Sequence, residues 1–566
     1  MKKLIIFFSA CIFLLAGCNN LDLSPLSEGS DANWFSDESE LEMAVLNVFH
    51  PDFWDGYAPL SFYWNTDDYC SRTAARELLN GTVTGRSSDI INAWDWCYMC
   101  IARANFVLSN FERAEGVPDA KMKMYEANAR FARAAQYAKL IFHWGDVPYY
   151  EGSIDIDEAF MMGRTDKNEI LKSIYADYDF AIEHLPLDYS SSEYYLATRG
   201  TALAFKARIA LYMGDYAIAR DAAKACIELG TYQLFPDFKT LFLSETKNSV
   251  ETIFSVPYLV EQNRYWTSNE VHNVMPRTVS GLANPSPSWD LFCSFLCTDG
   301  LPIDESPLFN PREPFENRDP RCTATIVEFG KNFLGATYSP HPDSVQVYNY
   351  NTGRMVANKD TRSVDIWAAY NGLVWAKFID DTWMDKRTDN DNIIMRYADV
   401  LLMYAEAKIE LGEIDPSVLD AMNQVRARAY GVDVNDDSSY PKITTTSQSE
   451  LRKLLRVERR MEFARENTIR YNDIIRWKLA EKVINIPRYG LLDVEPLKAI
   501  VAQGLWFFPE TPPIDEDGVA DFKPMHDKGL VRLLIGRSFD PAKHYLWPIP
   551  TSEIIINENM KQNPGY

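Results

Sequence analysis

The sequence predicts a mainly α-helical protein in which a scaffold of helical repeats, similar to tetratricopeptide repeats, carries a large irregular subdomain. Two observations lead to this fold class. Apolar residues recur at helical spacing in paired segments, each about as long as one tetratricopeptide unit. Between these pairs, residues 232–392 are rich in proline, asparagine and aromatic residues and show no helical period. We therefore expect stacked helix pairs with an insertion of loops and short strands.

The first element is an N-terminal signal. A basic start and an apolar run over residues 4–15 precede the motif LAGC at 15–18. The run is too short to span a bilayer, and the small residues before Cys18 allow a peptidase to cleave there. We predict that residues 1–17 are removed, that Cys18 is lipidated, and that 18–30 form a tether; two or more acyl chains suffice for stable membrane attachment. The alternative is an ordinary secretory signal that contains Cys18 by chance.

Composition disfavours several functions. The formal net charge is −23, so a body that binds nucleic acid or an anionic membrane is disfavoured. Seven of the nine cysteines lie beyond the signal and the lipid site, so at least one stays unpaired. The pairs Cys97/Cys100 and Cys293/Cys297 have partial metal-ligand spacing, but no histidine pair completes a four-ligand zinc site. We expect no metal and no cofactor, with Cys97 and Cys100 as small apolar residues in a helix.

Helices are expected in order along the chain. Residues 119–143 are expected to form a helix, because Phe131, Ala135, Ala138 and Phe142 recur at steps of four, three and four on one face. Gly145 ends this helix. Residues 168–185 are expected to form a similar helix.

Two helix pairs follow the tetratricopeptide pattern. Residues 199–230 form the first pair, with the turn at Gly214, and residues 394–431 form the second. In the second pair Gly412 ends one helix and Pro416 starts the next. A pair of this kind cannot bury its apolar face alone, so the pairs should stack into a curved scaffold.

These elements predict three regions after the tether. A helical N-terminal region covers 31–231, the irregular insertion covers 232–392, and a C-terminal region with a further repeat covers 393–566. Short β-like runs such as 251–256 lie in the insertion, and a smaller irregular segment covers 504–546. The aromatic content of the insertion argues against disorder, so we interpret it as a ligand-binding subdomain.

Short motifs occur in a specific order along nearly the whole chain. They are Leu21-Asp22-Leu23-Ser24-Pro25, Thr66-Asp67-Asp68, Trp94 with Tyr98, Ile101, Ala104 and Asn105, Asn284-Pro285-Ser286-Pro287, Asp299-Gly300, Asn317-Arg318-Asp319-Pro320-Arg321, the segment 396–407, Glu458-Arg459-Arg460 with Glu462, Phe463 and Glu466, Arg470 with Asp473, Arg476 and Trp477, Trp547-Pro548-Ile549-Pro550 and Asn563-Pro564-Gly565-Tyr566. Together with LAGC, this series resembles the SusD/RagB family of outer-membrane nutrient-binding lipoproteins of Bacteroidetes.

The resemblance implies a tetratricopeptide-type scaffold that holds an irregular ligand-binding face at the cell surface. It further implies a lid on a SusC-like TonB-dependent transporter of the outer membrane, with no catalysis of its own. Most members of the family are tied to glycans, and some, like the RagB type, handle peptides. A glycan is therefore the expected ligand, with a peptide as the alternative.

Several motif residues are expected to be structural. The charges within 458–477, such as Glu466 and Arg470, sit at helical steps and predict internal or interface ion pairs. Trp94 has helical spacing to its apolar neighbours, which indicates a core residue, whereas Trp289 fits either a core or a binding role.

A glycan site needs aromatic rings for sugar C–H faces and planar polar groups for hydroxyls, on rigid non-helical backbone. Two irregular segments offer both, one around 61–68 and one at 263–269. For any single aromatic residue, burial and ligand contact are equally expected. The candidate ligand-binding residues are Tyr63, Trp64, Asn65, Asp67, Arg72, Arg86, Trp96, Tyr265, Trp266 and Asn269.

Two other functions remain as hypotheses. Glycoside hydrolysis needs two carboxyl groups about 5 to 9.5 Å apart. The neighbours Asp67 and Asp68, or Asp380 and Asp381, could in principle supply them, but residues adjacent in sequence seldom face each other in that way. The signatures G-x-S-x-G and H-E-x-x-H and a phosphate-binding glycine loop are absent. The third hypothesis is a structural outer-membrane lipoprotein that serves as a docking scaffold.

Overall fold

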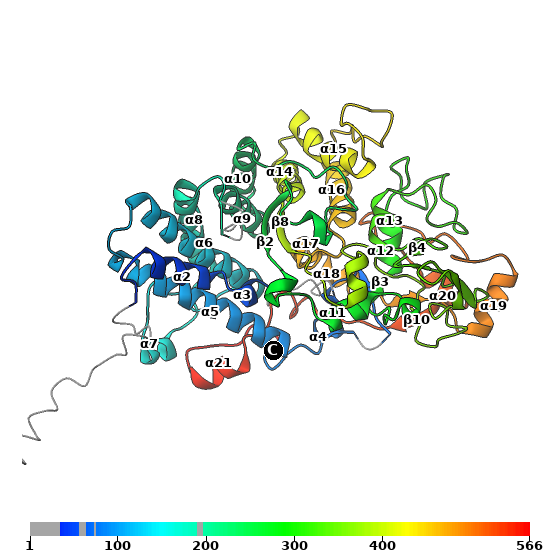
Figure 1. Ribbon diagram of the computed structural model, residues 1–566, viewed down its shortest axis with the longest axis horizontal. Helices are drawn as coiled ribbons and strands as arrows, with labels where there is room; N and C mark the ends of the chain where they lie inside the picture. Colours follow the sequence, from blue (N-terminus) through cyan, green and yellow to red (C-terminus); the bar gives the residue numbers. More distant parts are fainter. Residues whose placement is uncertain (1–33, 56–63, 73–74, 190–195) are drawn as a thin grey trace, which may run out of the picture.

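The computed structural model describes residues 34–55, 64–72, 75–189 and 196–566. Its first half is helical and forms one end of the long axis in Figure 1. The helices of this half are α2 (Glu38–Val48), α3 (Pro51–Asp55), α4 (Glu77–Asn80), α5 (Ser88–Asn110), α6 (Asp119–Trp144), α7 (Ile156–Met161), α8 (Lys167–His184), α9 (Arg199–Met213) and α10 (Tyr216–Glu228). The predicted helices at 119–143 and 168–185 are thus confirmed as α6 and α8.

The helical half is built from antiparallel neighbours. α6 packs against α5 and α8, and α9 packs against α8 and α10. Gly145 ends α6, and Gly214 separates α9 from α10 with φ of 86°. That left-handed conformation costs glycine little and lets the chain reverse within one residue. The predicted helical-repeat fold is confirmed.

The middle region is irregular, as expected, and contains short strands and helices. They are β2 (Thr252–Val256), α11 (Ser268–Val274), β3 (Ser286–Pro287), α12 (Trp289–Ser294), α13 (Arg321–Thr325), β4 (Asn332–Phe333), β5 (Ala336–Thr337), β6 (Gln346–Asn349), β7 (Arg354–Ala357) and β8 (Asn392–Arg396). One further strand, β1 (Tyr69–Cys70), precedes α4 in the chain. β1 pairs with β3 and β2 with β8, both antiparallel, while β4 to β7 form one antiparallel sheet in chain order.

The C-terminal region returns to helices. It contains α14 (Tyr397–Leu411), α15 (Pro416–Tyr430), α16 (Gln448–Phe463), α17 (Ile469–Arg476), α18 (Ala480–Val483), β9 (Arg488–Gly490), α19 (Val494–Ala502), α20 (Lys523–Asp527), β10 (Arg532–Ile535) and α21 (Thr551–Ile556). The predicted repeat at 394–431 is present with one difference: the first helix begins at Tyr397, because 392–396 form strand β8 and pair with β2. Asp415 caps the second helix by accepting the N–H of Ser417 at 3.0 Å.

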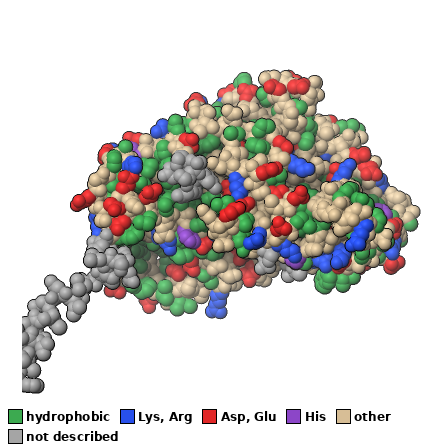
Figure 2. Space-filling model, viewed as in Figure 1, with side chains coloured by type: hydrophobic (Ala, Val, Ile, Leu, Met, Phe, Trp, Pro, Cys, Tyr) green, Lys and Arg blue, Asp and Glu red, His purple; other side chains and the backbone are tan. Residues whose placement is uncertain are grey.

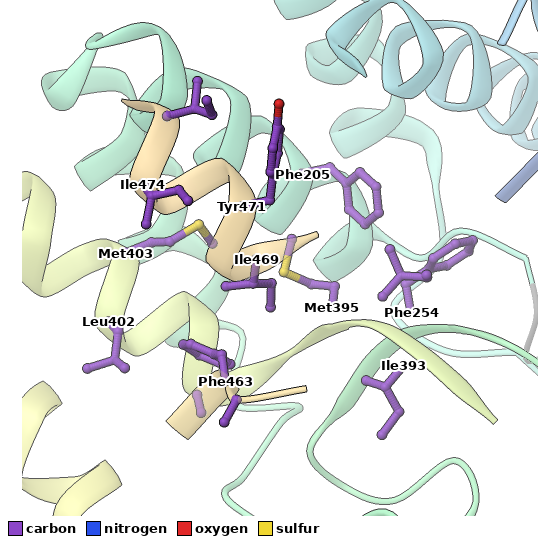
Figure 3. Packing of buried hydrophobic residues seen from close by; sticks show 14 of the residues in the cluster. Phe205, Phe254, Ile393, Met395, Leu402, Met403, Phe463, Ile469, Tyr471 and Ile474 are labelled. Atoms are coloured by element: carbon purple, nitrogen blue, oxygen red, sulfur yellow. The ribbon is translucent and has the colours of Figure 1, made fainter. Parts of the chain in front are cut away.

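One hydrophobic core joins these regions. It extends from Phe35 to Met560, so the insertion is not packed as a separate body. Figure 3 shows Phe205 from α9 and Phe254 from β2 near Met395 from β8, with Ile469 of α17 close by. The strand pair β2–β8 therefore anchors the irregular region on the helical scaffold.

Buried ion pairs lie beside this core on α16 and α17. Glu462 accepts hydrogen bonds from Arg396 at 2.6 Å, from Arg321 at 3.0 Å and from Arg428. Arg396 also bonds Glu466, whose other partner is Lys377 at 2.6 Å.

The ion pairs predicted within 458–477 are thus confirmed as internal. Their partners are distant in sequence, however, because Glu466 pairs with Arg396 and Lys377 while Arg470 pairs with Asp67.

Candidate functional site

The first predicted segment is largely structural. Asp67 is completely buried and receives a bidentate pair of hydrogen bonds from Arg470, at 2.8 and 2.5 Å. Burial would raise its pKa, but Arg470 and Arg460 hold that pKa well below its usual range. The prediction that Asp67 contacts ligand is therefore corrected, because its carboxylate neutralises buried arginines. Asn65 is also buried, which leaves it no surface to offer a ligand.

Trp64 is half-buried, and the Arg76 guanidinium lies 4.8 Å from its ring centroid. Arg76 also pairs with Asp89 at 3.0 Å, so the indole is held in a local polar contact. Tyr63 lies outside the described residues. Arg86 is exposed and Trp96, on α5, is half-buried. Among the described residues no bond or ring contact joins Arg86 or Trp96 to the other predicted site residues.

The second predicted segment places its tryptophan in the core. Trp266 is 6% exposed, stacks on Tyr258 with ring centroids 4.4 Å apart, and donates its indole N–H to the Asn390 carbonyl at 2.8 Å. This geometry corrects its assignment as a sugar platform, because neither face of a buried, stacked ring can receive a sugar. Tyr265 is half-buried with Arg387 at 5.5 Å. Asn269 lies in the first turn of α11, and its side chain is outside the described part of the structure.

Trp94, predicted to be a core residue, and Trp289, left undecided, both prove to be core residues. Trp94 is buried and meets Trp144 edge to face at 5.4 Å, as predicted. Trp289 is also buried and donates to the Asn371 carbonyl at 2.8 Å.

The carboxylate pairs considered for catalysis are in structural bonds. Asp68 pairs with Arg460 at 3.0 Å, and Asp380 accepts the N–H groups of Ser244 and Thr382, both at 3.0 Å. These bonds give the two aspartates structural roles.

The cysteines are structural as well. The seven in the described ranges are all free and buried, and burial raises the pKa of the Cys97 and Cys100 thiols to about 12. Within those ranges no group of His, Cys, Asp and Glu could hold a metal ion. No helix there is long and apolar enough to span a bilayer.

Arg72 lies beside an exposed aromatic surface that the sequence analysis did not predict. Its guanidinium lies 5.7 Å from the ring centroid of Trp367, which is 52% exposed. The backbone N–H of Arg72 donates to Asn284 at 2.9 Å, which ties the end of β1 to the segment before β3. Ile366 beside the tryptophan is also exposed. A large ring and an aliphatic side chain thus face solvent on irregular backbone, as a stacking ligand requires.

The local sequence explains why this tryptophan points outward. Asp365 accepts the N–H of Trp367 at 2.9 Å and thereby fixes a turn. The next two residues, Ala368 and Ala369, are buried and anchor the chain. Tyr370 follows, half-buried between two guanidinium groups. Trp367 and Tyr370 stand beside Asp and Asn in the irregular insertion, so the criterion used for the two predicted segments could also have selected them.

Three arginines lie over these two rings and a fourth, Arg277, bonds Asp365 beside them; we name Arg72, Arg277, Arg362 and Arg532 the arginine cluster. Arg277 donates to Asp365 at 2.7 Å. Arg362 and Arg532 lie 4.7 and 5.2 Å from the ring centroid of Tyr370. They come from distant segments: the end of β1, the loop after α11, the loop after β7 and strand β10.

A second exposed aromatic face lies on the sheet β6–β7. Tyr348 pairs across the strands with Met355, and both are exposed, whereas Val347 on the opposite face is buried. The Tyr350 ring lies 5.0 Å from that of Tyr348. Asn358, one residue after β7, accepts the N–H of Asp360 at 3.1 Å, which orders the chain after this strand. This short stretch connects the exposed face of β6–β7 to the segment that carries Trp367.

A helical-repeat scaffold that presents exposed rings and arginines defines a binding protein. The chain belongs to the SusD family, whose model matches residues 250–566. A second family model, described as starch-binding and associating with the outer membrane, matches residues 60–211.

The chain is similar to SusD-like protein P2 of Formosa agariphila, with 24% identity over all of both chains. Two solved structures share the fold. A SusD-like carbohydrate-binding protein from Bacteroides fragilis has a TM-score of 0.75 at 25% identity and covers 93% of this chain and 99% of its own. A laminarin-binding SusD-like protein has a TM-score of 0.64 at 18% identity and covers 94% of this chain and 100% of its own.

Proposed function

We propose that the protein binds an oligosaccharide or polysaccharide without cleaving it, with Trp367 as the main platform, and delivers it to a SusC-like TonB-dependent transporter. The observation that carries the proposal is the exposed Trp367 ring beside Arg72 and Tyr370 on ordered irregular backbone. Sugar C–H faces pack on such rings, and guanidinium groups bond hydroxyl or acidic groups. Membership in the SusD family and the carbohydrate-binding relatives support a glycan over the peptide of the alternative hypothesis.

Trp367→Ala tests the platform. Loss of one stacking ring removes roughly 0.5–1.5 kcal/mol of binding energy by analogy with aromatic pairs, so affinity should fall about 2- to 12-fold. A glycan array on the purified mature protein identifies the ligand, and calorimetry measures the affinity. Phe160→Ala is the matched control, because Phe160 is a similarly exposed ring on helix α7 of the scaffold. Equal affinity of both variants and wild type would remove Trp367 from the site.

The opposite end of the molecule has the features of a docking surface for the transporter. Large apolar side chains are exposed on α5, α7 and α21, beside a cavity of about 530 Å³ that these three helices help to line. Figure 1 places α7 and α21 next to each other at the edge of the helical end. The exposed residues are Met99, Phe106, Ile156, Phe160, Met161, Ile555 and Ile556.

A protein suits this surface better than a lipid headgroup layer. α7 and α21 contain no lysine or arginine, whereas helices that lie on membranes are typically rich in both. A tag on this chain should co-purify one large β-barrel protein in mild detergent, and the double variant Met161→Glu, Ile555→Glu should lose it while glycan affinity is unchanged. Retention of the barrel by the double variant would place the contact elsewhere.

We further propose lipid anchoring through Cys18 at the outer membrane, facing the outside of the cell. In cells that lack the transporter, Cys18→Ala should leave the membrane fraction. If the variant still fractionates with the outer membrane, the anchor is not at Cys18.

A further inference from the structure

We propose that the bound glycan is an acidic polysaccharide, whose carboxylate or sulfate groups are recognised by the arginine cluster around Trp367 and Tyr370. This inference rests on the proposed glycan-binding function and specifies its substrate class.

The first support is the local charge. Two carboxylates serve the cluster: Asp365 pairs with Arg277 at 2.7 Å, and Asp493 pairs with Arg362 at 2.7 Å and with Arg532. No ion pair joins Arg72 to a carboxylate among the residues that the structure describes. Four guanidinium groups thus face two paired carboxylates and the buried Asp360, which accepts the backbone N–H of Arg277, in a chain whose formal net charge is −23. The guanidinium groups on this surface therefore outnumber the carboxylates.

The second support is the state of Arg72. Its side chain is half-buried, and its Nη1 atom is buried without a hydrogen-bond partner. Burial and the neighbouring charge of Arg277 lower the pKa of Arg72. A buried guanidinium N–H without a partner costs free energy, and an anion beside the exposed part of this side chain would offset that cost through its charge. The nearby carboxylate of Asp365 already pairs with Arg277. An acidic group on a ligand would give Arg72 a counter-charge of its own.

The third support is geometric. Guanidinium groups form paired, parallel hydrogen bonds with carboxylates and sulfate-like oxyanions, and they do so better than lysine. Trp367 offers an apolar face 5.7 Å from the Arg72 guanidinium, so one sugar residue could stack and place an acidic substituent toward the arginine. Arg354 on β7 and Lys359, two residues after that strand, are also exposed. In Figure 2 lysine and arginine side chains gather on the part of the surface where Figure 1 places β10.

The experiment compares three polysaccharides on the purified mature protein: polygalacturonate, which carries carboxylates, carrageenan, which carries sulfates, and starch, which is neutral. At 50 mM NaCl we expect at least 10-fold tighter binding of one acidic polymer than of starch, and weaker acidic binding at 500 mM NaCl. Tighter binding of polygalacturonate would indicate recognition of carboxylates, and tighter binding of carrageenan would indicate recognition of sulfates. Equal affinity for starch, or affinity that does not change with salt, would overturn the inference.

Variants localise the effect. Arg72→Gln should weaken acidic binding about 5- to 10-fold without changing the thermal midpoint, and Arg72→Lys should recover part of that loss. Arg113→Gln, an exposed arginine just after α5, is the matched charge control and should bind as wild type does. Unchanged affinity in Arg72→Gln would overturn the assignment, as would equal binding of double-stranded DNA, which would indicate general attraction of polyanions. Binding of neutral glycans alone refutes this inference but leaves the proposed function; binding of no polysaccharide refutes the proposed function itself.

Discussion

Two groups of arginines in this protein differ in their surroundings and therefore in their roles. Those around Glu462 are buried, and every guanidinium faces a carboxylate from another helix or strand. Those around Tyr370 lie in the irregular region, near the surface, and outnumber their carboxylates. The buried group holds the scaffold together, whereas the arginine cluster has charge left for a ligand. Arginine content alone therefore does not locate a binding site; the balance of charge and the burial do.

The strongest way to break this contrast is to remove a carboxylate from the buried group. Glu462→Gln leaves Arg321, Arg396 and Arg428 without their shared anion, so the free energy of unfolding should fall by about 3–5 kcal/mol. Chemical denaturation measures this loss. The control is Glu495→Gln, whose side chain is 86% exposed and which should change stability by less than about 0.5 kcal/mol. A loss below about 1 kcal/mol in Glu462→Gln would mean that the buried group adds little.

Two tryptophan variants sharpen the same contrast. Trp266→Ala empties a core position stacked on Tyr258 and should cost about 3–5 kcal/mol of stability. Trp367→Ala removes an exposed ring and should cost less than about 1 kcal/mol while weakening glycan binding. Thermal unfolding and calorimetric titration of both variants give the two readouts. Similar losses of stability in the two variants would contradict the division between core and surface.

The pH dependence of stability gives a third test, which concerns Asp360 beneath the arginine cluster. Asp360 is buried and accepts the backbone N–H of Arg277 at 2.6 Å, and burial raises its pKa to about 6. Because the folded state holds this proton more tightly than the unfolded state does, its contribution to stability is fully present below about pH 4 and is lost as the pH rises through 6.

The stability advantage of wild type over Asp360→Asn should therefore fall by up to about 3 kcal/mol between pH 4 and 7. Urea denaturation at several pH values measures the difference. A difference that does not change over this range would show that Asp360 titrates normally in the folded protein.

The smallest expected effect concerns Arg76, which belongs to neither group. Arg76→Gln removes a contact with the Trp64 ring and one partly exposed ion pair with Asp89. Such contacts contribute about 0.5–1 kcal/mol each at most. Chemical denaturation of Arg76→Gln, Trp64→Phe and the double variant gives the coupling energy between the two side chains, which isolates the ring contact. A coupling energy near zero would assign the whole effect to the ion pair.

The regular part of the fold was readable from the sequence because helical periodicity and glycine stops act locally. α6, α8, α9 and α10 fall where spacing predicted them, and the charges within 458–477 are paired internally as predicted, although their partners lie far away in the sequence. Strand β8, which precedes the first helix of the C-terminal repeat, was not predicted. It forms by pairing with β2, about 140 residues earlier in the chain, and local periodicity does not show such pairing.

The site was harder to predict because exposure of an aromatic ring depends on contacts between distant segments. Trp266 and Trp367 both lie in irregular sequence beside polar residues, yet Tyr258 and Asn390 bury the first while Ala368 and Ala369 turn the second outward. Asp67 was misassigned for a similar reason, since its partner Arg470 is 403 residues away.

The bond between Asp67 and Arg470 has a consequence for how the chain can be divided. Asp67 pairs with Arg470, 403 positions away, and with Arg460 on α16, so a fragment that ends before α16 would bury Asp67 without any counter-charge. A fragment that begins after β1 would leave Arg470 in the same state. We therefore expect neither half to be stable alone, so the ligand-binding surface and the scaffold should be exchanged or engineered as one piece.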